Sequence, residues 1–139
     1  MRIAEIGVKD VYCTAPTATL SEAASLMKRH GVGAVPVCEG DHLVGMLTDR
    51  DIVLSCVAAG MNPAACQVNE IMTSEPIAVN PQVELEDAAE IMAREQVRRL
   101  PLVENNRLVG MVSLGDLAVA LSNSDSVVAD TLRKISAAP

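Results

Sequence analysis

Two short stretches of the chain place a hydroxyl side chain three residues before a carboxylate. Thr48 is followed by Asp51, and Ser113 is followed by Asp116. A hydroxyl and a carboxylate at this spacing cap a helix, because each side chain accepts a hydrogen bond from the backbone N–H of the other residue. The same pair also suits a ribose phosphate. The ribose hydroxyls can donate to the carboxylate, and the N-terminus of the helix favours the phosphate. Both interpretations follow from the residue types.

The two stretches are copies within an internal repeat. Pro36 and Pro101 lie 65 positions apart in the sequence, and so do Gly45 and Gly110. No gap is needed to align residues 3–56 with the second copy. Self-similarity of this length predicts two equivalent halves related by a pseudo-two-fold axis.

Each repeat predicts the same order of strand, helix, hairpin and helix. The predicted strands are 11–14, 34–38 and 43–47 in the first repeat, and 77–79, 100–104 and 108–112 in the second. One helix of the first repeat begins at Thr19, which forms a capping box with Glu22, and the other runs from Thr48 to Gly60. The fold class is therefore predicted as α/β (α+β), with two pseudo-symmetric β-α-β-β-α subdomains in one paired module.

The two copies resemble CBS (cystathionine-β-synthase) domains. That family carries a hydrophobic-Pro-hydrophobic strand, then a Gly with two apolar residues, then [Thr/Ser]-x-x-Asp. The chain reads Gly45-Met46-Leu47-Thr48-Asp49-Arg50-Asp51 and Gly110-Met111-Val112-Ser113-Leu114-Gly115-Asp116 at these places. The resemblance implies a stand-alone CBS pair with CBS domain 1 at 3–59, a connector at 60–67, CBS domain 2 at 68–122 and a C-terminal helical tail at 123–139.

The resemblance also implies a function. CBS pairs bind AMP, ADP, ATP or S-adenosylmethionine in clefts between their two halves, without catalysis, and signal to a partner protein. The implied ribose ligands are Asp51 and Asp116, with Thr48 and Ser113 on ribose or phosphate. The adenine is expected beside apolar strand residues, which are Pro36, Pro101, Cys13 and Ala78. No cofactor is required, because the nucleotide is a regulatory ligand.

Three arginines are candidates for the phosphate. Arg98 and Arg99 precede the second proline strand, where the alternation of a strand lets only one of them face the ligand. Arg50 lies on the first turn of a predicted helix. Each guanidinium either clamps a phosphate or pairs with a nearby acid on the surface.

Cysteine positions leave a second question open. In the CBS fold the strands that carry Cys13 and Cys38 run side by side and parallel, so a disulfide between these residues is geometrically feasible. The alternative is two reduced thiols in a reducing compartment. Cys56 on a helix and Cys66 in the connector are expected to be unpaired.

Composition excludes several function classes. The chain of 139 residues has a net charge of −7 and one aromatic residue, Tyr12, which disfavours nucleic acid. It lacks a membrane-length apolar run and a signal peptide, so a cytoplasmic location is expected. No catalytic or metal-binding constellation is present, so we expect no enzyme. The alternative function is a scaffold or redox-responsive CBS protein with unoccupied ligand sites.

The helices carry more apolar surface than one thin sheet layer covers, which predicts a homodimer. The residues concerned are Leu26, Met27, Ile91, Met92, Val53, Leu54, Val57, Leu117 and Leu121. The tail forms a further apolar stripe that is expected to pack onto the module or a partner. Its members are Val127, Val128, Thr131, Leu132 and Ile135.

Overall fold

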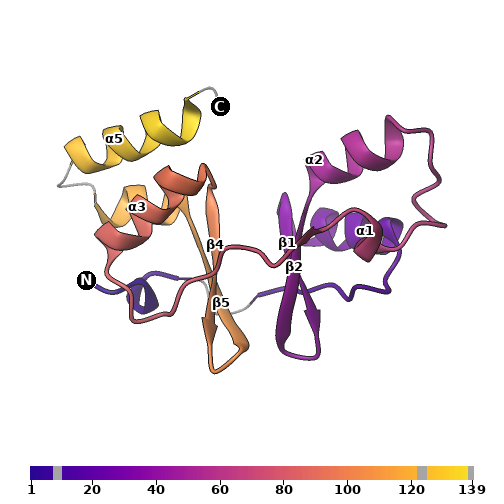
Figure 1. Cartoon of the computed structure of the whole chain (residues 1–139), viewed down its shortest axis with the longest axis horizontal. Helices are drawn as coiled ribbons and strands as arrows, with labels where there is room; N and C mark the ends of the chain where they lie inside the picture. The colour runs from indigo at the N-terminus through magenta and orange to yellow at the C-terminus, as the bar shows by residue number, and fades with distance from the viewer. Residues whose placement is uncertain (8–10, 122–124, 138–139) are drawn as a thin grey trace. The chain divides into compact units, whose positions relative to one another are not determined.

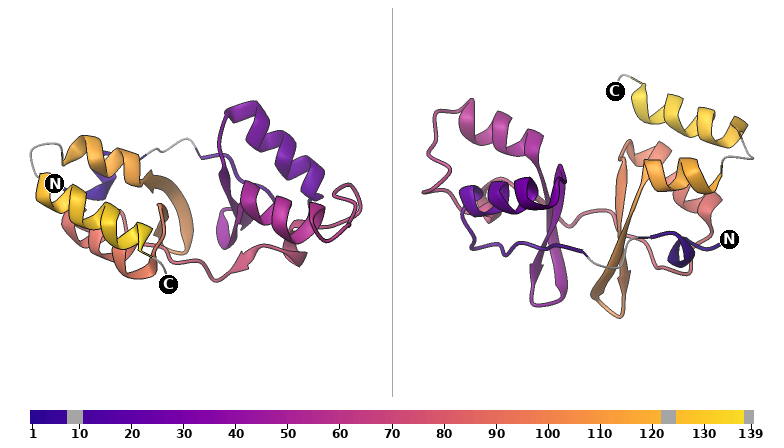
Figure 2. Two further views of the ribbon diagram at one scale, coloured as in Figure 1. Left: turned by 90° about the horizontal axis from the view of Figure 1, so that it is seen from above. Right: turned by 180° about the vertical axis from the view of Figure 1, so that it is seen from behind.

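The computed structural model describes residues 1–7, 11–121 and 125–137. The chain divides into two compact units. Unit 1 consists of Met1–Val11 and Ile77–Pro139, and unit 2 consists of Tyr12–Pro76 (Figure 1). In each unit the helices pack on one face of a β-hairpin, as both views of Figure 2 show.

Unit 2 begins with α1 (Leu20–His30), followed by the hairpin of β1 (Ala34–Glu39) and β2 (His42–Thr48). The Oγ1 of Thr19 caps α1 by accepting the N–H of Glu22 at 3.1 Å, as predicted. After the hairpin come α2 (Asp49–Ile52) and η2 (Val53–Val57), and the predicted stop at Gly60 has a φ of +74°. The connector leads to η3 (Val68–Glu70) and to β3 (Thr73–Ser74), which pairs antiparallel with β2.

Unit 1 repeats this order. After η1 (Ile3–Glu5) it contains α3 (Leu85–Glu95), β4 (Arg99–Glu104), β5 (Arg107–Ser113), α4 (Leu114–Ala120) and α5 (Asp125–Ser136). The β4–β5 turn is Asn105-Asn106, with φ values of 53° and 64°. Two successive positive φ values are the geometry of a hairpin turn that Asn tolerates.

The first segment of each repeat packs in the other repeat's unit. Ile3 donates its N–H to the Val83 carbonyl at 2.9 Å and is fully buried in the core of unit 1. Val68, its equivalent, donates to the Ala18 carbonyl at 2.8 Å and is fully buried in unit 2. The compact units therefore differ from the sequence repeats by an exchange of these segments. The predicted boundary between 122 and 123 lies outside the described residues.

The first strand predicted in each repeat is shortened to a single bridge. Thr14 pairs in parallel with Val37, and Val79 pairs in parallel with Leu102. The prediction of full strands at 11–14 and 77–79 was therefore wrong. In a parallel ladder the next bond towards the N-terminus needs the N–H of residue 36 or 101, and both are prolines that lack this donor.

Each unit has its own aliphatic core. The core of unit 2 contains Leu20, Ala23, Met27, Val35, Val37, Leu47, Ile52, Cys56, Cys66 and Val68. The core of unit 1 contains Ile3, Val79, Leu85, Ala88, Met92, Leu100, Leu102, Val112, Leu117, Leu121 and Ile135. Four residues proposed for a dimer surface, Met27, Met92, Leu117 and Leu121, are thus buried inside their own units.

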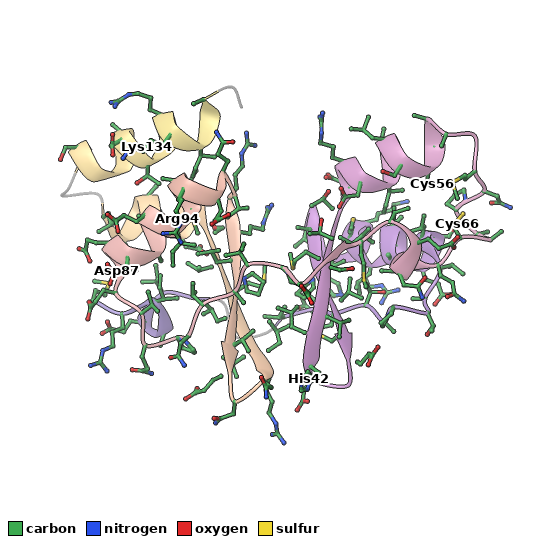
Figure 3. All side chains as sticks on the ribbon, in the orientation of Figure 1. His42, Cys56, Cys66, Asp87, Arg94 and Lys134 are labelled. Carbon is green, nitrogen blue, oxygen red and sulfur yellow. The ribbon has the colours of Figure 1, made fainter. Side chains whose placement is uncertain are left out.

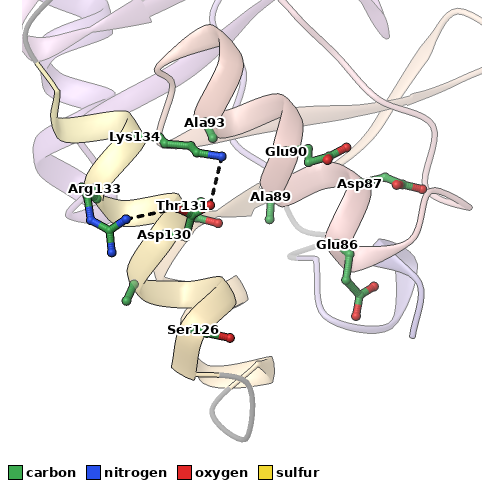
Figure 4. Close-up of a pocket in the computed structure, with 11 residues that line it drawn as sticks. Glu86, Asp87, Ala89, Glu90, Ala93, Ser126, Asp130, Thr131, Arg133 and Lys134 are labelled. Atoms are coloured by element: carbon green, nitrogen blue, oxygen red, sulfur yellow. Dashed lines mark hydrogen bonds and ion pairs between the residues drawn. The ribbon is translucent and has the colours of Figure 1, made fainter.

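Helix α5 packs against α3 within unit 1. Thr131 and Ile135 are buried as predicted, whereas Leu132 is 51% exposed and leaves the predicted stripe. The side chains of Val127 and Val128 lie outside the described residues. Gln96 donates through Nε2 to the carbonyls of Lys134 and Ala137, at 3.3 and 2.9 Å, and so caps the end of α5. Figure 4 shows the groove between the two helices, in which Lys134 and Arg133 turn towards Asp130.

Candidate functional site

One face of each hairpin carries the proline and the hydroxyl residue predicted to bind ligand, and both prolines are buried. In unit 2, Pro36 lies opposite Met46, and Ala34 lies opposite Thr48. Residues directly opposite one another on antiparallel strands share a face, and so do residues two positions apart. Val35 and the other alternate residues instead point into the core.

Unit 1 repeats this arrangement. Pro101 lies opposite Met111, and Arg99 lies opposite Ser113. In each hairpin the proline and the hydroxyl residue therefore lie on the same face, which we call the proline face of that unit. The entry segments lie next to it, since the N–H of Thr14 donates to the Pro36 carbonyl and that of Val79 to the Pro101 carbonyl, each at 3.0 Å.

The two hydroxyl–carboxylate pairs form reciprocal helix caps. The N–H of Asp51 donates to Thr48 Oγ1 at 3.1 Å, and the N–H of Thr48 donates to Asp51 Oδ2 at 2.9 Å. Ser113 and Asp116 make the same bonds at 3.1 and 2.8 Å. The capping interpretation is therefore confirmed. Each cap uses only Oδ2, and within the described residues no group donates to either Oδ1.

The starts of the two equivalent helices carry different charge. In unit 2 the Asp49 carboxylate accepts the N–H of Arg50 through Oδ1 at 2.8 Å. In unit 1 the corresponding residues are Leu114 and Gly115, so no carboxylate occupies that place. An anion next to Asp49 would be repelled, whereas the start of α4 presents no negative charge at its first two positions.

Of the adjacent arginines, Arg99 lies on the proline face. It pairs with Ser113 across the hairpin, whereas Arg98 precedes β4 and its carbonyl accepts the N–H of Leu114 at 2.8 Å. No ion pair of Arg50, Arg98 or Arg99 is present within the part of the chain that the structure describes. The interpretation that they balance local acids therefore receives no support from the described contacts.

The predicted cysteine neighbours are in contact. Cys38 Sγ–H donates to Cys13 Sγ at 3.5 Å, and both residues are free thiols. Cys38 is buried and Cys13 is exposed. Burial raises the pKa of Cys38 to about 12, with further contributions from the hydrogen bond and charge of Cys13 and from Asp41.

Comparison with known proteins decides the family. The sequence profile of the CBS domain matches residues 3–57 and again residues 68–123. The chain belongs to the CBS domain family. It is a CBS pair, and modules of this kind are regulatory and commonly bind nucleotides.

Relatives of this CBS pair include proteins of similar length. The CBS domain-containing protein YhcV of Bacillus subtilis is 50% identical over 124 residues, which cover 86% of this chain and 88% of the relative. Hypoxic response protein 1 of Mycobacterium tuberculosis is 38% identical over 109 residues, or 78% of this chain and 76% of that protein. A crystal structure of Hypoxic Response Protein I with two coordinated zinc ions matches with a TM-score of 0.79 and 36% identity, covering 86% of this chain and 98% of that one.

The module also occurs within a larger enzyme. Inosine-5′-monophosphate dehydrogenase of Korarchaeum cryptofilum is 35% identical over 111 residues. That match covers 79% of this CBS pair and 22% of the enzyme.

A second cysteine contact was missed by the sequence prediction. Both Cys56 and Cys66 are free thiols, so the expectation that they are unpaired is confirmed, although the two side chains are neighbours (Figure 3) and the Cys56 Sγ–H donates to the Met61 carbonyl at 3.6 Å. Burial first, then the charge of Glu70 and then Cys56, raise the pKa of Cys66. The aligned repeat gave no signal for this contact, because it depends on the path by which the connector returns to η2.

Within the described residues of the CBS pair, no cluster of three or more His, Cys, Asp or Glu side chains is arranged to hold a metal ion. No helix in the described ranges has the length and hydropathy of a membrane span.

Proposed function

We propose that this CBS pair binds an adenosine-type ligand and transmits its occupancy to a partner protein. The observation that carries the proposal is the duplicated cap. In each unit an Asp carboxylate caps a helix through Oδ2, no group within the described residues donates to its Oδ1, and its capping partner Thr48 or Ser113 lies on the proline face. One carboxylate can therefore serve the fold and a ligand together, which reconciles the two interpretations of the Thr/Ser-x-x-Asp spacing.

The chemistry of the proline face suits a nucleoside. Oδ1 of Asp51 or Asp116 is an acceptor for a ribose hydroxyl, and a hydrogen bond to a charged acceptor contributes about 1.5–3 kcal/mol. Pro36 and Pro101 are themselves buried, so the adenine is assigned to the partly exposed apolar side chain opposite each of them, Met46 or Met111, with backbone groups supplying its hydrogen bonds. AMP, ADP, ATP and S-adenosylmethionine all present this adenosine moiety.

The two units are proposed to differ in their preference for charge. Unit 1 offers Arg99 on the proline face and no carboxylate at the first two positions of α4, which favours a phosphate. Unit 2 places Asp49 at the start of α2, which favours an adenosine ligand without a phosphate in that position. Replacing Arg99 with Ala is expected to weaken the binding of AMP more than the binding of adenosine. Equal losses for the two ligands would contradict a phosphate role.

Thermal unfolding in the presence of ligands tests the proposal. A ligand at a hundredfold excess over its Kd stabilises the folded state by about 2.7 kcal/mol. We expect stabilisation by at least one of AMP, ADP, ATP, S-adenosylmethionine and adenosine. The matched control is the 2′-deoxy form of the best ligand, which lacks one ribose hydroxyl and should stabilise less. No stabilisation by any of the five would favour the alternative, a scaffold whose caps serve only the fold.

The proposed signalling route is self-association and a protein effector. Val53, Leu54 and Val57 lie on α2–η2 with more than half of each side chain exposed. An exposed apolar patch of this kind marks an interaction surface. We assign it to a homodimer in the cytoplasm, whose docking onto an effector changes with ligand occupancy.

A further inference from the structure

We propose that Cys13 and Cys38 form a dithiol that hydroperoxides oxidise to a disulfide, with Cys13 reacting first and Cys38 completing the bond. The proposal does not depend on nucleotide binding. It rests on the contact between the two sulfurs, on their different exposure and on the backbone that holds them together.

The backbone fixes both residues at disulfide spacing. Thr14, next to Cys13, bridges in parallel to Val37, next to Cys38, and the N–H of Cys38 donates to the Thr14 carbonyl at 2.9 Å. Neighbouring strands lie about 4.8 Å apart, and a disulfide needs Cα atoms about 4.4–6.8 Å apart. On the other side of Cys13, the Tyr12 ring stacks on His30 with centroids 3.4 Å apart. The cysteine is therefore anchored through both of its neighbours.

The two sulfurs have unequal access to solvent. Cys13 is exposed, so a peroxide can reach it, whereas Cys38 is buried behind it. The Cys38 Sγ–H donates to the Cys13 sulfur, and burial raises the pKa of Cys38, so the buried partner stays protonated. This arrangement supplies one accessible nucleophile and one protonated partner already in contact.

The reaction balances with one hydroperoxide. The Cys13 thiolate attacks one peroxide oxygen, the O–O bond breaks, and the departing oxygen takes a proton to leave as an alcohol or, from hydrogen peroxide, as water. Cys13 is then a sulfenic acid. The Cys38 sulfur attacks the Cys13 sulfur, the S–O bond breaks, and the hydroxide takes the Cys38 proton to leave as water. Two thiols lose two electrons in total, and the peroxide gains them.

The disulfide would join the start of unit 2 to β1. Val11 is the last residue of the N-terminal segment in unit 1 and Tyr12 the first in unit 2, so Cys13 lies directly after the crossing. The bond would secure the entry segment beside Pro36, which otherwise has a single bridge. Cys13 and Cys38 are 25 positions apart, and closing a loop of this length should raise the melting temperature by roughly 10 °C.

The chain contains a matched control for this chemistry. Cys56 and Cys66 are also neighbours, but both are buried, at 0% and 6% exposure, and the Cys56 Sγ–H donates to the Met61 carbonyl. Contact alone would make both pairs react, whereas the proposal requires an exposed sulfur. The Cys56–Cys66 pair should therefore stay reduced while the protein is folded.

The test is oxidation of the full, reduced chain with a small excess of hydrogen peroxide, followed by alkylation and peptide mass spectrometry without reduction. We expect a Cys13–Cys38 linked peptide, alkylated Cys56 and Cys66, and a melting temperature that returns to its original value with dithiothreitol. Cys38→Ser should leave Cys13 as a sulfenic acid that dimedone captures, and Cys13→Ser should leave Cys38 unoxidised.

Three results would overturn the proposal. One is a Cys56–Cys66 link that forms before the Cys13–Cys38 link. Another is dimedone capture at Cys38 in the Cys13→Ser variant. The third is stoichiometric zinc on the Cys13 and Cys38 sulfurs of the purified chain, released by thiol modification, because thiolates are zinc ligands and bound metal would block the oxidation.

Discussion

Ser113 and Asp116 exchange two hydrogen bonds across the first turn of α4, and the oxygen of Asp116 that stays outside this exchange is the one assigned to the ligand. Removing the hydroxyl from either cap should lower the stability of the fold. Ser113→Ala and Thr48→Ala should each lower the free energy of unfolding by about 1 kcal/mol, because the N–H of the third helical residue loses its acceptor. Urea denaturation measures this loss.

The control for the caps is Ser25→Ala, which removes a hydroxyl from the exposed middle of α1. Its effect should stay within about 0.5 kcal/mol. Losses as small as this in the two cap variants would show that the reciprocal bonds do not stabilise the fold.

Two glycines should respond to Ala in opposite directions. A Cβ on Gly45 would lie 2.6 Å from Met72 Sδ and 2.9 Å from the Thr73 carbonyl oxygen, so Gly45→Ala forces β3 away and should cost about 1–3 kcal/mol. Gly115 has only Ser113 Oγ nearby, at 3.6 Å. Gly115→Ala in α4 should therefore be neutral or stabilise by up to about 1 kcal/mol. Denaturation midpoints of both variants check the signs, and destabilisation of equal size would contradict the packing described for β3.

Alkaline pH should destabilise the fold. The folded state raises the pKa of Cys38 from 9.0 to about 12, so between these values the folded chain keeps a proton that the unfolded chain has lost. Stability therefore falls as pH rises through this window. The raised pKa of Cys66 acts in the same direction.

The variant Cys38→Ser separates the contribution of Cys38, since serine does not titrate in this range. The decrease in unfolding free energy between pH 8 and pH 11 should be smaller in the variant than in the reduced wild-type chain. An identical decrease in both proteins would show that Cys38 has the same pKa folded and unfolded.

Equivalent positions of the repeat allow a controlled test of assembly. Leu54 and Val119 occupy the same place in the two repeats and both are exposed, but only Leu54 has two further exposed valines beside it on the same element. Leu54→Lys should convert the proposed homodimer to a monomer of about half the mass in light scattering, and Val119→Lys should leave the dimer intact. A wild-type chain that is already monomeric would refute the assignment of this patch.

Local features of the fold were predictable from sequence, because they depend on residues three or four positions apart. Thr19, Thr48 and Ser113 fix where three helices begin, and Asn105-Asn106 fixes a turn. The same local reasoning located the caps on which the candidate site is built.

Features set by long-range packing were not predictable. The repeat shows that Ile3 and Val68 are equivalent, but it carries no information on which core receives each one. The contact of Cys56 with Cys66 likewise depends on the path of the connector. The lost first strands could have been foreseen, since Pro36 and Pro101 remove the donors that a longer ladder needs.

Calorimetric titration with AMP tests the central claim most directly, using the wild-type chain and Asp116→Asn. An asparagine keeps one side-chain oxygen for the cap but loses the second oxygen and the charge. The account predicts that the wild type binds AMP and that Asp116→Asn binds about 10–100-fold more weakly, with an unfolding free energy close to that of the wild type. AMP binding of unchanged affinity in Asp116→Asn would contradict it, and so would a wild-type chain that binds none of AMP, ADP, ATP, S-adenosylmethionine and adenosine.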